Sequence, residues 1–424
     1  MTTTLRRLFR FASPIVPSGL RTGLMNLRLW CVVVAWTGVA WTLGLLARLG
    51  KPVSLVALGG ERIGTLSGIP DMLFRMRQND LVARNTTYII LIGRPANEPL
   101  LEIVARHFPV LRAPRLYTTL INACSGSRYL QECPQIVKRD YRSYARVHHG
   151  APDCMPPGPK AKAALSAYFD RLGIPQDSWF VCIHNRDPAY LTEAFPGQNW
   201  SHHDYRDCSI SNYMAAAEHV VERGGYVFRV GNVVTTPLHA DRSPQIIDTA
   251  VEERDPLLEI ALISHCRMFL GCSAGIYAAA TFFNRPLALC NMLPLEIATY
   301  TEHDIFIPKL LYSRTKKRLL TWSEIHSLGV FHGGEAGNAD FYERNGINVI
   351  ENSSQDILDL CIERLAIAEL GPGAVSPEDR ELQLEFKERY MSHLDGYAHM
   401  GHLSTHFLRR HFDLWDERSR RTGS

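Results

Sequence analysis

A run of small residues between two apolar stretches could bind an anion. The segment FLGCSAGIYAAATFFNRPLALCN, residues 269–291, has the pattern of a strand, a tight loop, a helix, a turn and a second strand. The loop residues Ser273, Ala274 and Gly275 carry little side-chain bulk. An anion could therefore approach the unpaired N–H groups at the start of the helix. This pattern predicts a phosphate-binding loop, although the same small residues would also let helix and strand pack closely.

Polar side chains directly follow another apolar strand and form a second candidate group. The strand Phe180–Ile183 runs into His184, Arg186 and Asp187, and Tyr190 follows. Polar groups at the carboxyl end of a buried strand face the ligand crevice of an α/β protein. Arg186 could bind a phosphate through its guanidinium fork. Asp187 could orient that arginine, accept a sugar hydroxyl or act as a base. The alternative is a structural ion pair beneath the loop.

The next segment, NWSHHDYRD at residues 199–207, is dense in aromatic and hydrogen-bonding side chains. Rings can cover the apolar faces of a sugar while amides and carboxylates bind its hydroxyls. We therefore expect Asn199, Tyr205 and Asp207 to shape a sugar pocket. His202 and His203 are adjacent, so their side chains point in different directions and make a poor metal-binding pair.

Arg229, near the end of the strand Tyr226–Val230, could neutralise a pyrophosphate or could be a surface charge. Towards the C-terminus, His399, His402 and His406 have helical spacing, as some zinc ligands do, but no cysteine or carboxylate completes the set. The chain has no Asp-x-Asp sequence, which argues against an enzyme that holds a divalent metal with that pair. We expect no metal, and we expect arginines and a helix N-terminus to stabilise the developing charge.

The elements that must position these groups alternate between strand and helix, which is typical of parallel sheets with crossover helices. The pattern predicts the following strands and helices: strands Val53–Leu58, Thr87–Ile92, Trp179–Ile183, Tyr226–Val230 and Arg267–Gly271, and helices near Pro70–Arg77, Asn97–Phe108, Lys160–Leu172, Asn212–Arg223 and Asp255–Cys266. Two such α/β series in tandem would place a ligand in the cleft between them.

Composition limits the class of protein. The chain has 424 residues, which is enough for two ordinary domains, and its net charge of +3 argues against a dedicated nucleic-acid binder. The 10 cysteines include no Cys-x-x-Cys pair, and several lie in apolar runs, including Cys182, Cys266 and Cys290. They are typical of reduced, buried thiols, so we expect a reducing compartment.

The first 60 residues contain no Asp or Glu, and five arginines precede an uncharged run from Leu29 to Ala47 that is closed by Arg48 and Lys51. The run is near the length that crosses a bilayer. Its charge bias favours a cytoplasmic N-terminus, which would place the rest outside, against the indication of the cysteines. An anchor lying in the plane of the membrane would satisfy both signals, and a buried helix is the alternative. We expect association with the cytoplasmic face of the inner membrane.

These shifts in composition divide the chain into four parts. We expect a basic N-terminus with a membrane-associating helix at 1–51, a first α/β domain with a proline-rich linker at 52–159, a second α/β domain at 160–370, and a charged helical tail at 371–424. The pattern leaves open whether the tail crosses back over the first domain.

Several ordered blocks together resemble bacterial glycosyltransferases linked to surface polysaccharides. They are CIHNRDPAY, NWSHHDYRDCSISNY, GGYVFRVG, FLGCSAGIY and NRPLALCN, within Trp179 to Ser313, and GERIGTL at residues 60–66 looks like a first-domain motif of that family. The resemblance implies an α/β protein of the GT-B fold, with two Rossmann-like domains facing across a cleft. It implies that residues 52–159 are the acceptor domain with its linker and that residues 160–370 are the nucleotide-sugar domain. Arg62, in the first-domain motif, is assigned to the sugar or acceptor side.

His184 and Arg186 are also similar to the His-x-Arg element of the broader fucosyltransferase-like group, in which the arginine contacts the donor diphosphate. The resemblance implies that role for Arg186, with Arg229 and the loop Ser273–Gly275 nearby. The loop departs from the family, because relatives tend to have more glycine and threonine there. Donation by the backbone should survive this change, whereas a hydroxyl contact is in doubt.

Together these features predict a membrane-associated, metal-independent glycosyltransferase. It would move a hexosyl or deoxyhexosyl group from a nucleoside diphosphate sugar to a surface glycan or a lipid-linked acceptor, with no cofactor and no nucleic-acid partner. Asp187 and Glu61 are the candidate bases, since each follows a strand end that faces the cleft. Two other functions remain open: a nucleotide-sugar epimerase on the same fold, and a non-catalytic nucleotide-binding member of a polysaccharide assembly complex.

Overall fold

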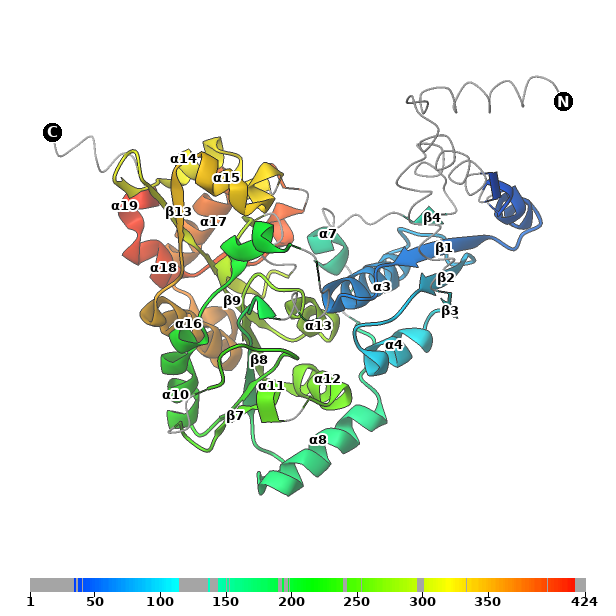
Figure 1. Cartoon of the computed structure of the whole chain (residues 1–424), viewed down its shortest axis with the longest axis horizontal. Coiled ribbons are helices and arrows are strands. Elements are labelled where there is room, and N and C mark those ends of the chain that lie inside the picture. Colours follow the sequence, from blue (N-terminus) through cyan, green and yellow to red (C-terminus); the bar gives the residue numbers. More distant parts are fainter. Residues whose placement is uncertain are drawn as a thin grey trace.

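The chain forms two α/β units that lie side by side (Figure 1). The computed structural model describes residues 34–35, 37–39, 41–113, 136–137, 144–149, 151, 153–189, 193, 197, 199–238, 242–252, 254–295, 301–332, 334–394 and 396–415. The smaller first unit, blue to cyan in Figure 1, contains the strands up to β4 and the helices up to α7. The larger second unit, green to red, contains the elements from α8 onward.

The first unit is built on a parallel sheet with strand order β3-β2-β1-β4. Its elements are β1 (Val53–Leu58), α3 (Ile63–Gln78), β2 (Thr87–Ile92), α4 (Glu98–Ala105), β3 (Val110–Arg112), β4 (Ile136–Val137) and α7 (Tyr144–His149). Strand β1 leads directly into α3, so the start of that long helix lies at the carboxyl edge of the sheet. In Figure 1, α3 points from this unit towards the second one.

The second unit is built on a larger sheet with strand order β14-β10-β9-β8-β5-β6-β7, and its pairings are parallel. Its strands are β5 (Phe180–Ile183), β6 (Tyr226–Arg229), β7 (Ile246–Asp248), β8 (Met268–Gly271), β9 (Leu287–Met292), β10 (Ile305–Pro308) and β14 (His402–Leu403). The chain runs outward from β5 to β7 and then returns to the other side of β5 with β8. This reversal of strand order is the place where open α/β sheets bind ligands.

Helices and a small antiparallel sheet complete the second unit. The helices are α8 (Pro159–Leu172), α10 (Met214–Glu222), α11 (Thr249–Glu252), α12 (Pro256–His265), α13 (Tyr277–Phe282), α14 (Trp322–Ser327), α15 (Ala339–Arg344), α16 (Ser354–Leu370), α17 (Pro377–Met391), α18 (Thr405–Arg410) and α19 (Phe412–Trp415). The antiparallel sheet has the order β12-β11-β13, from β11 (Leu310–Ser313), β12 (Arg318–Leu319) and β13 (Ile347–Ile350). Short 3-10 helices include η1 (Ser201–Arg206), η2 (Ile210–Tyr213) and η7 (Tyr397–His399).

The predicted fold class is confirmed, because two parallel α/β units face each other as expected. The strand–loop–helix–turn–strand pattern at residues 269–291 is present as β8, α13 and β9. The prediction for α3 was wrong at its start, since the helix begins at Ile63 and contains Pro70. Proline usually marks a first helical turn. Here the buried residues Leu66 and Leu73, on either side of it, hold the helix on the sheet.

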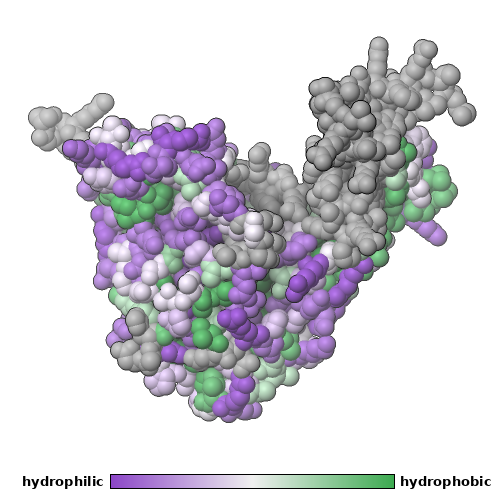
Figure 2. Space-filling view, viewed as in Figure 1, coloured by the Kyte–Doolittle hydropathy of each residue, from purple (hydrophilic) through white to green (hydrophobic). Residues whose placement is uncertain are grey.

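The N-terminal segment is described only in part. Residues 34–35, 37–39 and 41–48 are helical, and the remaining residues of the predicted run Leu29–Ala47 lie outside the described part of the chain. Within the described residues, no helix is both long and apolar enough to cross a bilayer. The side chains of Val34, Trp41, Leu45 and Leu49 are all more than half exposed. Hydrophobic surface is visible at the outer edge of the first unit in Figure 2.

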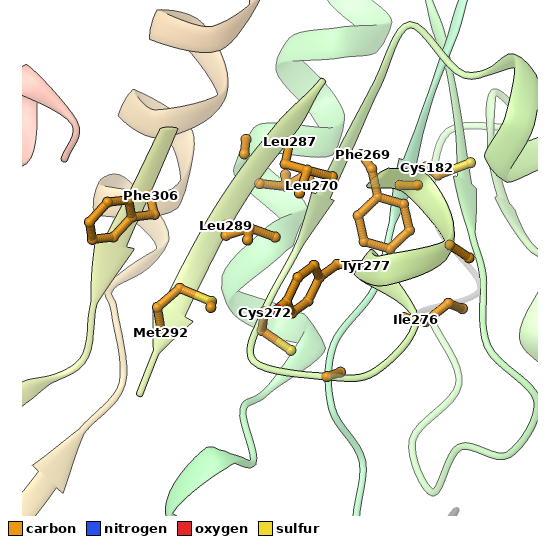
Figure 3. Packing of buried hydrophobic residues seen from close by; sticks show 14 of the residues in the cluster. Cys182, Phe269, Leu270, Cys272, Ile276, Tyr277, Leu287, Leu289, Met292 and Phe306 are labelled. Carbon is orange, nitrogen blue, oxygen red and sulfur yellow. The ribbon is translucent and has the colours of Figure 1, made fainter. Parts of the chain in front are cut away.

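The core of the second unit is dry and tightly packed around β8 and β9. Figure 3 shows apolar side chains of β8, α13, β9 and β10 gathered between the ribbons, including Phe269, Leu289 and Phe306. These three residues are fully buried. Cys182, Cys266 and Cys290 are also buried and free, as the sequence predicted. A packed sheet of this kind is a rigid support for the loops at its carboxyl edge.

A buried arginine, paired with a carboxylate on its own helix, connects the two units. Arg75 and Asp71 lie one turn apart on α3, and both side chains are completely buried. The Nε of Arg75 donates to both carboxylate oxygens of Asp71, at 3.1 and 3.0 Å, and Tyr144 Oη donates to the same carboxylate. Nη2 of Arg75 donates to Oδ1 of Asn284, in the turn after α13, at 2.6 Å. The guanidinium therefore bonds both units at once.

We expect Arg75→Met to lower the free energy of unfolding by roughly 3–5 kcal/mol, because it leaves the Asp71 carboxylate buried without its cation. Arg84→Met is the matched control. Arg84 and Asp80 have the same four-residue spacing, but their side chains are 69% and 64% exposed, so this change should cost less than about 1 kcal/mol. Urea unfolding of both variants measures the difference. Equal losses would show that the buried pair has no special role.

Candidate functional site

A cavity of about 310 Å³ lies between the two units. It is bounded by loops at the carboxyl ends of the strands. Across the larger sheet, Ile183 of β5 is paired with Leu270 of β8 on one side and Arg229 of β6 on the other. The loops that follow these three strands therefore leave the sheet together. The lining residues are Arg62–Thr65, Gly68, Ala96 and Tyr144 of the first unit, and His184–Asp187, His203, Arg206, Gly231–Val233, Glu259 and Ala274–Ala278 of the second.

Two glycines bring the units into contact at this cavity. Gly64, in the first turn of α3, lies against Gly275 in the loop after β8. A Cβ placed on Gly64 would be 2.8 Å from the Cα of Gly275 and 2.9 Å from its carbonyl oxygen. A Cβ on Gly275 would be 3.2 Å from the backbone nitrogen of Gly64. No other residue type fits this approach without moving backbone, so the two glycines set the width of the cavity.

Arg186 lies at the cavity wall and is held in place by its neighbours. Its Nε donates to Oδ1 of Asp207 at 2.8 Å, and its backbone N–H donates to the sulfur of Cys272 at 3.1 Å. The side chains of Arg186 and Asp207 are only 13% and 22% exposed. A guanidinium fixed on one edge by a carboxylate can present its remaining N–H groups to an anion.

Arg206 is a second cavity arginine, which our reading of the sequence missed. Its Nε donates to the carbonyl oxygen of Ser273 at 2.8 Å and to the Ser273 hydroxyl at 3.2 Å, so it is attached to the loop after β8. Burial, followed by the nearby charge of Arg186, lowers the pKa of Arg206 from its usual value. Two neighbouring guanidinium groups disfavour each other's charge, and an anionic ligand beside them would offset that repulsion.

Arg62 adds a third positive charge from the first unit. It lines the cavity, and its guanidinium lies over the ring of Trp200 at 5.1 Å. The sequence assigned Arg62 to the acceptor side, and it does stand on the wall that the first unit contributes. Arginines from both units therefore converge on one space.

Arg229 is not at the cavity, and its expected contact with a diphosphate is corrected here. The side chain is completely buried, pairs with Asp248 at 3.1 Å and donates to Oδ1 of Asn185 at 3.0 Å. Asn185 in turn donates to the carbonyl oxygen of Cys208 at 3.0 Å. The prediction correctly placed Arg229 near a strand end. At this position of β6, however, the side chain is enclosed by the protein and does not reach the cavity. It supports the loop that carries Arg186 instead.

Asp187 lines the cavity, but it is poorly suited to the role of a base. Its carboxylate accepts hydrogen bonds from the backbone N–H of Ala189 at 2.9 Å and from the N–H of Thr235 at 2.8 Å, and also from the Thr235 hydroxyl. Burial alone would raise the pKa of Asp187, but these hydrogen bonds outweigh it and leave the pKa below its usual value. The Asp187 side chain therefore connects the loop after β5 to the loop after β6, which carries Thr235.

Two histidines face the cavity as neutral rings. The Nδ1 of His184 lies 2.9 Å from the carbonyl oxygen of Val230, which fixes Nδ1 as the protonated nitrogen and leaves Nε2 as an acceptor. Burial lowers the pKa of His184 to about 4. Burial, together with the charge of Arg206, also lowers the pKa of His203 to about 4. Near neutral pH, neither ring adds positive charge.

Glu259, on α12, is the second carboxylate among the described residues that line the cavity. Burial raises the pKa of Glu259 to about 7, although Asn97 Nδ2, 3.4 Å away, opposes this shift. Asn97 belongs to the first unit, where it caps α4 by accepting from the N–H of Leu100, and it also donates to the carbonyl oxygen of Pro256. This carboxyl group therefore lies where the two units meet, with a pKa suited to proton transfer.

Four further predicted site residues, Asp207, Tyr205, Asn199 and Glu61, are not among the described residues that line the cavity. Asp207 acts on it through Arg186, whereas Tyr205 is buried against Tyr342 with ring centroids 5.4 Å apart. Asn199 is exposed and accepts from the N–H of Ser201, and Glu61 is outside the group of described lining residues. The sugar pocket predicted from these polar and aromatic residues is thus not assembled as expected. Tyr190 lies outside the described residues.

The loop after β8 faces the cavity with backbone rather than side chain. The Ser273 hydroxyl is buried and donates to the carbonyl oxygen of Leu293 at 2.9 Å. The N–H of Ala274 donates to the carbonyl oxygen of Cys272 at 2.6 Å, so this amide is not available to a ligand. The expectation that the amides of Ser273 and Ala274 bind the ligand is corrected accordingly: Ser273 is completely buried away from the lining, and Ala274 lines the cavity with its amide already paired. Gly275 is exposed to the cavity, and Ile276, Tyr277 and Ala278 at the start of α13 line it as well.

Comparisons with known proteins give only distant matches. No family model matches the sequence, and no curated protein matches it. Among solved structures, the ADP-heptose heptosyltransferase II of Escherichia coli has a TM-score of 0.35 and 11% identity over 56% of this chain and 83% of its own. A family 9 glycosyl transferase from Veillonella parvula has a TM-score of 0.39 and 11% identity over 61% and 86%.

The heptosyltransferase WaaC of Escherichia coli, solved with ADP, has a TM-score of 0.29 and 10% identity over 56% of this chain and 86% of its own. A likeness of this degree carries no weight for the chemistry of this chain. The fucosyltransferase-like character of the second unit stays a prediction.

Replacing Glu259 with glutamine should make stability less dependent on pH. The pKa of this carboxyl is about 7 in the folded protein against 4.5 ordinarily, so the folded state binds its proton more tightly. The wild type therefore loses stability as the pH rises from about 4.5 to 7. The free energy of unfolding of Glu259→Gln, taken relative to that of the wild type, should therefore rise by on the order of 2 kcal/mol between pH 4.5 and pH 8. Urea unfolding at both pH values measures this gain. If the difference in free energy of unfolding between the variant and the wild type were the same at both pH values, the raised pKa of Glu259 would be contradicted.

Proposed function

We propose that this protein is a glycosyltransferase that takes its sugar from a nucleoside diphosphate sugar. The observation that carries the proposal is the convergence of Arg62, Arg186 and Arg206 on one cavity between two α/β units. A diphosphate released from a sugar bears negative charge that grows as the glycosidic bond breaks. Fixed guanidinium groups aimed at that charge stabilise the transition state more than the ground state.

The arginines have different roles in this proposal. Arg186 and Arg206 lie on the second unit, next to the loop that ends at Gly275, and they bind the diphosphate through their guanidinium groups. Arg62 reaches the same space from the first unit, so it contacts the transferred sugar or the acceptor. Asp207 and Arg229 do not touch the ligand. They hold Arg186 and the loop of Asn185 in position.

The donor site works without a divalent metal in this proposal. Of the described residues that line the cavity, two are carboxylates, Asp187 and Glu259. The carboxylate of Asp187 already accepts three hydrogen bonds from protein groups. Burial raises the pKa of Glu259 to about 7, so this group is only partly ionised near neutral pH. Neither offers the pair of ionised oxygens that a magnesium or manganese ion needs, whereas three arginines supply positive charge directly.

Glu259 replaces Asp187 and Glu61 as the candidate base. A general base is most effective when its pKa lies near the working pH, and the pKa of Glu259 is about 7. Its position beside Asn97 places it where an acceptor bound to the first unit would meet a donor bound to the second. Removal of the acceptor proton by this carboxylate would accompany transfer of the sugar.

The acceptor is a surface glycan or a lipid-linked glycan, and the protein works at the cytoplasmic face of a membrane. Support comes from the N-terminal helical residues, where Trp41, Leu45 and Leu49 are 61%, 57% and 67% exposed. Basic residues flank this segment, with Arg48 and Lys51 at its end. Apolar side chains beside positive charges suit the headgroup region of an anionic bilayer. Hydrophobic surface lies at the edge of the first unit in Figure 2.

Arg186→Ala should weaken binding of a nucleoside diphosphate at least tenfold and abolish sugar transfer, because one charge-assisted contact is worth roughly 1.5–3 kcal/mol. Calorimetric titration with nucleoside diphosphates measures the binding, and release of nucleoside diphosphate from the donor sugar measures turnover. Arg223→Ala is the matched control, since Arg223 pairs with Glu369 outside the cavity and should leave both unchanged. Turnover retained by Arg186→Ala would remove this residue from the mechanism.

A further inference from the structure

Three side chains of the types that bind zinc meet at the surface, outside the group that lines the cavity. They are His149 at the end of α7, Glu302 in the turn before β10, and His399 in η7. Their ligand atoms all lie within 4.8 Å of one another. The Nδ1 of His149 is 3.7 Å from a carboxylate oxygen of Glu302, and the rings of His149 and His399 are stacked with centroids 3.9 Å apart. We propose that these three residues bind a zinc ion.

The set differs from the one that the sequence suggested. His399, His402 and His406 have helical spacing, but the structure places them in three separate elements, η7, β14 and α18. His402 is mostly buried, and His406 is exposed on α18. The missing carboxylate and the second imidazole come from distant parts of the chain instead. Sequence spacing could not have revealed this, because the three ligands are separated by 153 and 97 positions.

The three segments are held together by contacts that do not involve the ligands themselves. Gly396, with a φ of +75°, lies so close to α7 that a Cβ there would be 2.9 Å from the backbone nitrogen of Arg146. On the other side of α7, Asn79 Nδ2 donates to the carbonyl oxygen of Val147 at 2.8 Å. The N–H of His402 donates to the carbonyl oxygen of Asp304 at 2.9 Å. The backbone therefore brings the ligands together before any ion binds, which favours binding.

The distances suit a tetrahedral ion. Zinc binds imidazole nitrogen and carboxylate oxygen at about 2.0–2.2 Å, so two ligand atoms on one ion lie roughly 3.4 Å apart. The 3.7 Å between His149 and Glu302 is too long for a hydrogen bond but needs only a small side-chain rotation to reach that value. Two imidazoles and one carboxylate would leave the fourth position to water.

The surroundings predict moderate affinity. Lys387 is close enough to interact electrostatically with both Glu302 and His399, and its Nζ donates to the carbonyl oxygen of Met400. This positive charge opposes a cation at the site. His149 and Glu302 are each nearly half exposed, so an ion can enter from solvent without unfolding.

An ion at this site would add a further connection between the two units. Helix α7 begins with Tyr144, which lines the cavity and donates to Asp71, and it ends with His149. The two residues are five positions apart, which is about 7.5 Å along a helix. Zinc would fix the far end of this helix to Glu302 and His399 of the second unit. We expect it to stabilise the folded protein without taking part in sugar transfer.

The test uses the full chain, stripped with a chelator and dialysed, and titrated with Zn²⁺ against a chromophoric competitor. We expect one equivalent to bind with an affinity that His149→Ala and His399→Ala each weaken at least tenfold. His406→Ala removes an exposed histidine outside the cluster and should bind like wild type. Co²⁺ in place of Zn²⁺ should give the visible absorption of a tetrahedral site in wild type and His406→Ala, and lose it in the other two.

The folded state of each variant is checked in chelator, where all four proteins should unfold at the same temperature because the substituted side chains are exposed or partly exposed. With one equivalent of Zn²⁺, wild type and His406→Ala should unfold at a higher temperature than the cluster variants. The proposal would be contradicted if all four proteins bound zinc with equal affinity. It would also be contradicted if none of the four bound zinc. No donor sugar is used, so this result is independent of the proposed function.

Discussion

The close contact between Gly64 and Gly275 is the constraint on which the rest of the site depends. Two separate sheets can build one cavity only if their carboxyl edges face each other at a fixed distance. Here a helix of the first unit touches the loop after β8 of the second, backbone against backbone. The buried Arg75 side chain, bonded to Asp71 in one unit and to Asn284 in the other, holds the same helix from further along its length.

Burial and partners, more than position in the strand, decide what each arginine can do. Arg186 and Arg229 both lie at strand ends in the larger sheet. Arg229 is completely enclosed and has its charge matched by Asp248, so it stabilises the loop and binds nothing else. One edge of the Arg186 guanidinium donates to Asp207, and its remaining N–H groups are available to the cavity. The cavity thus receives its positive charge from residues held by neighbours, which is the arrangement that a charge-stabilising site needs.

Local patterns predicted the scaffold well because they reflect local physics. The apolar strands and the small residues before α13 each follow from a few adjacent residues, and both are present. The position of Arg186 at the cavity also follows from its place directly after a buried strand. The direction of a side chain does not follow from such local patterns, which is why Arg229 was assigned to a ligand although its side chain is completely buried.

What could not be predicted depends on contacts between distant segments. Arg206 lies next to Asp207, within the segment 199–207 that the sequence already indicated. Its partner Ser273 is 67 positions further along the chain, so their contact could not be predicted from neighbouring residues. The shifted pKa of Glu259 depends on packing of α12 against the first unit, and nothing in its own sequence signals that burial. His149, Glu302 and His399 are a further case, since three segments must fold before the set exists.

The most direct test of the account is the affinity of Gly64→Ala for a nucleoside diphosphate. In a helix, alanine is ordinarily more favourable than glycine by about 1 kcal/mol, so the change should not harm α3 itself. The added Cβ would instead press on Gly275 and force the units apart, which should weaken binding about tenfold or more. Gly337→Ala, where a Cβ meets nothing within 4 Å, should bind as wild type does. Unchanged affinity in Gly64→Ala would contradict a diphosphate site between the two units.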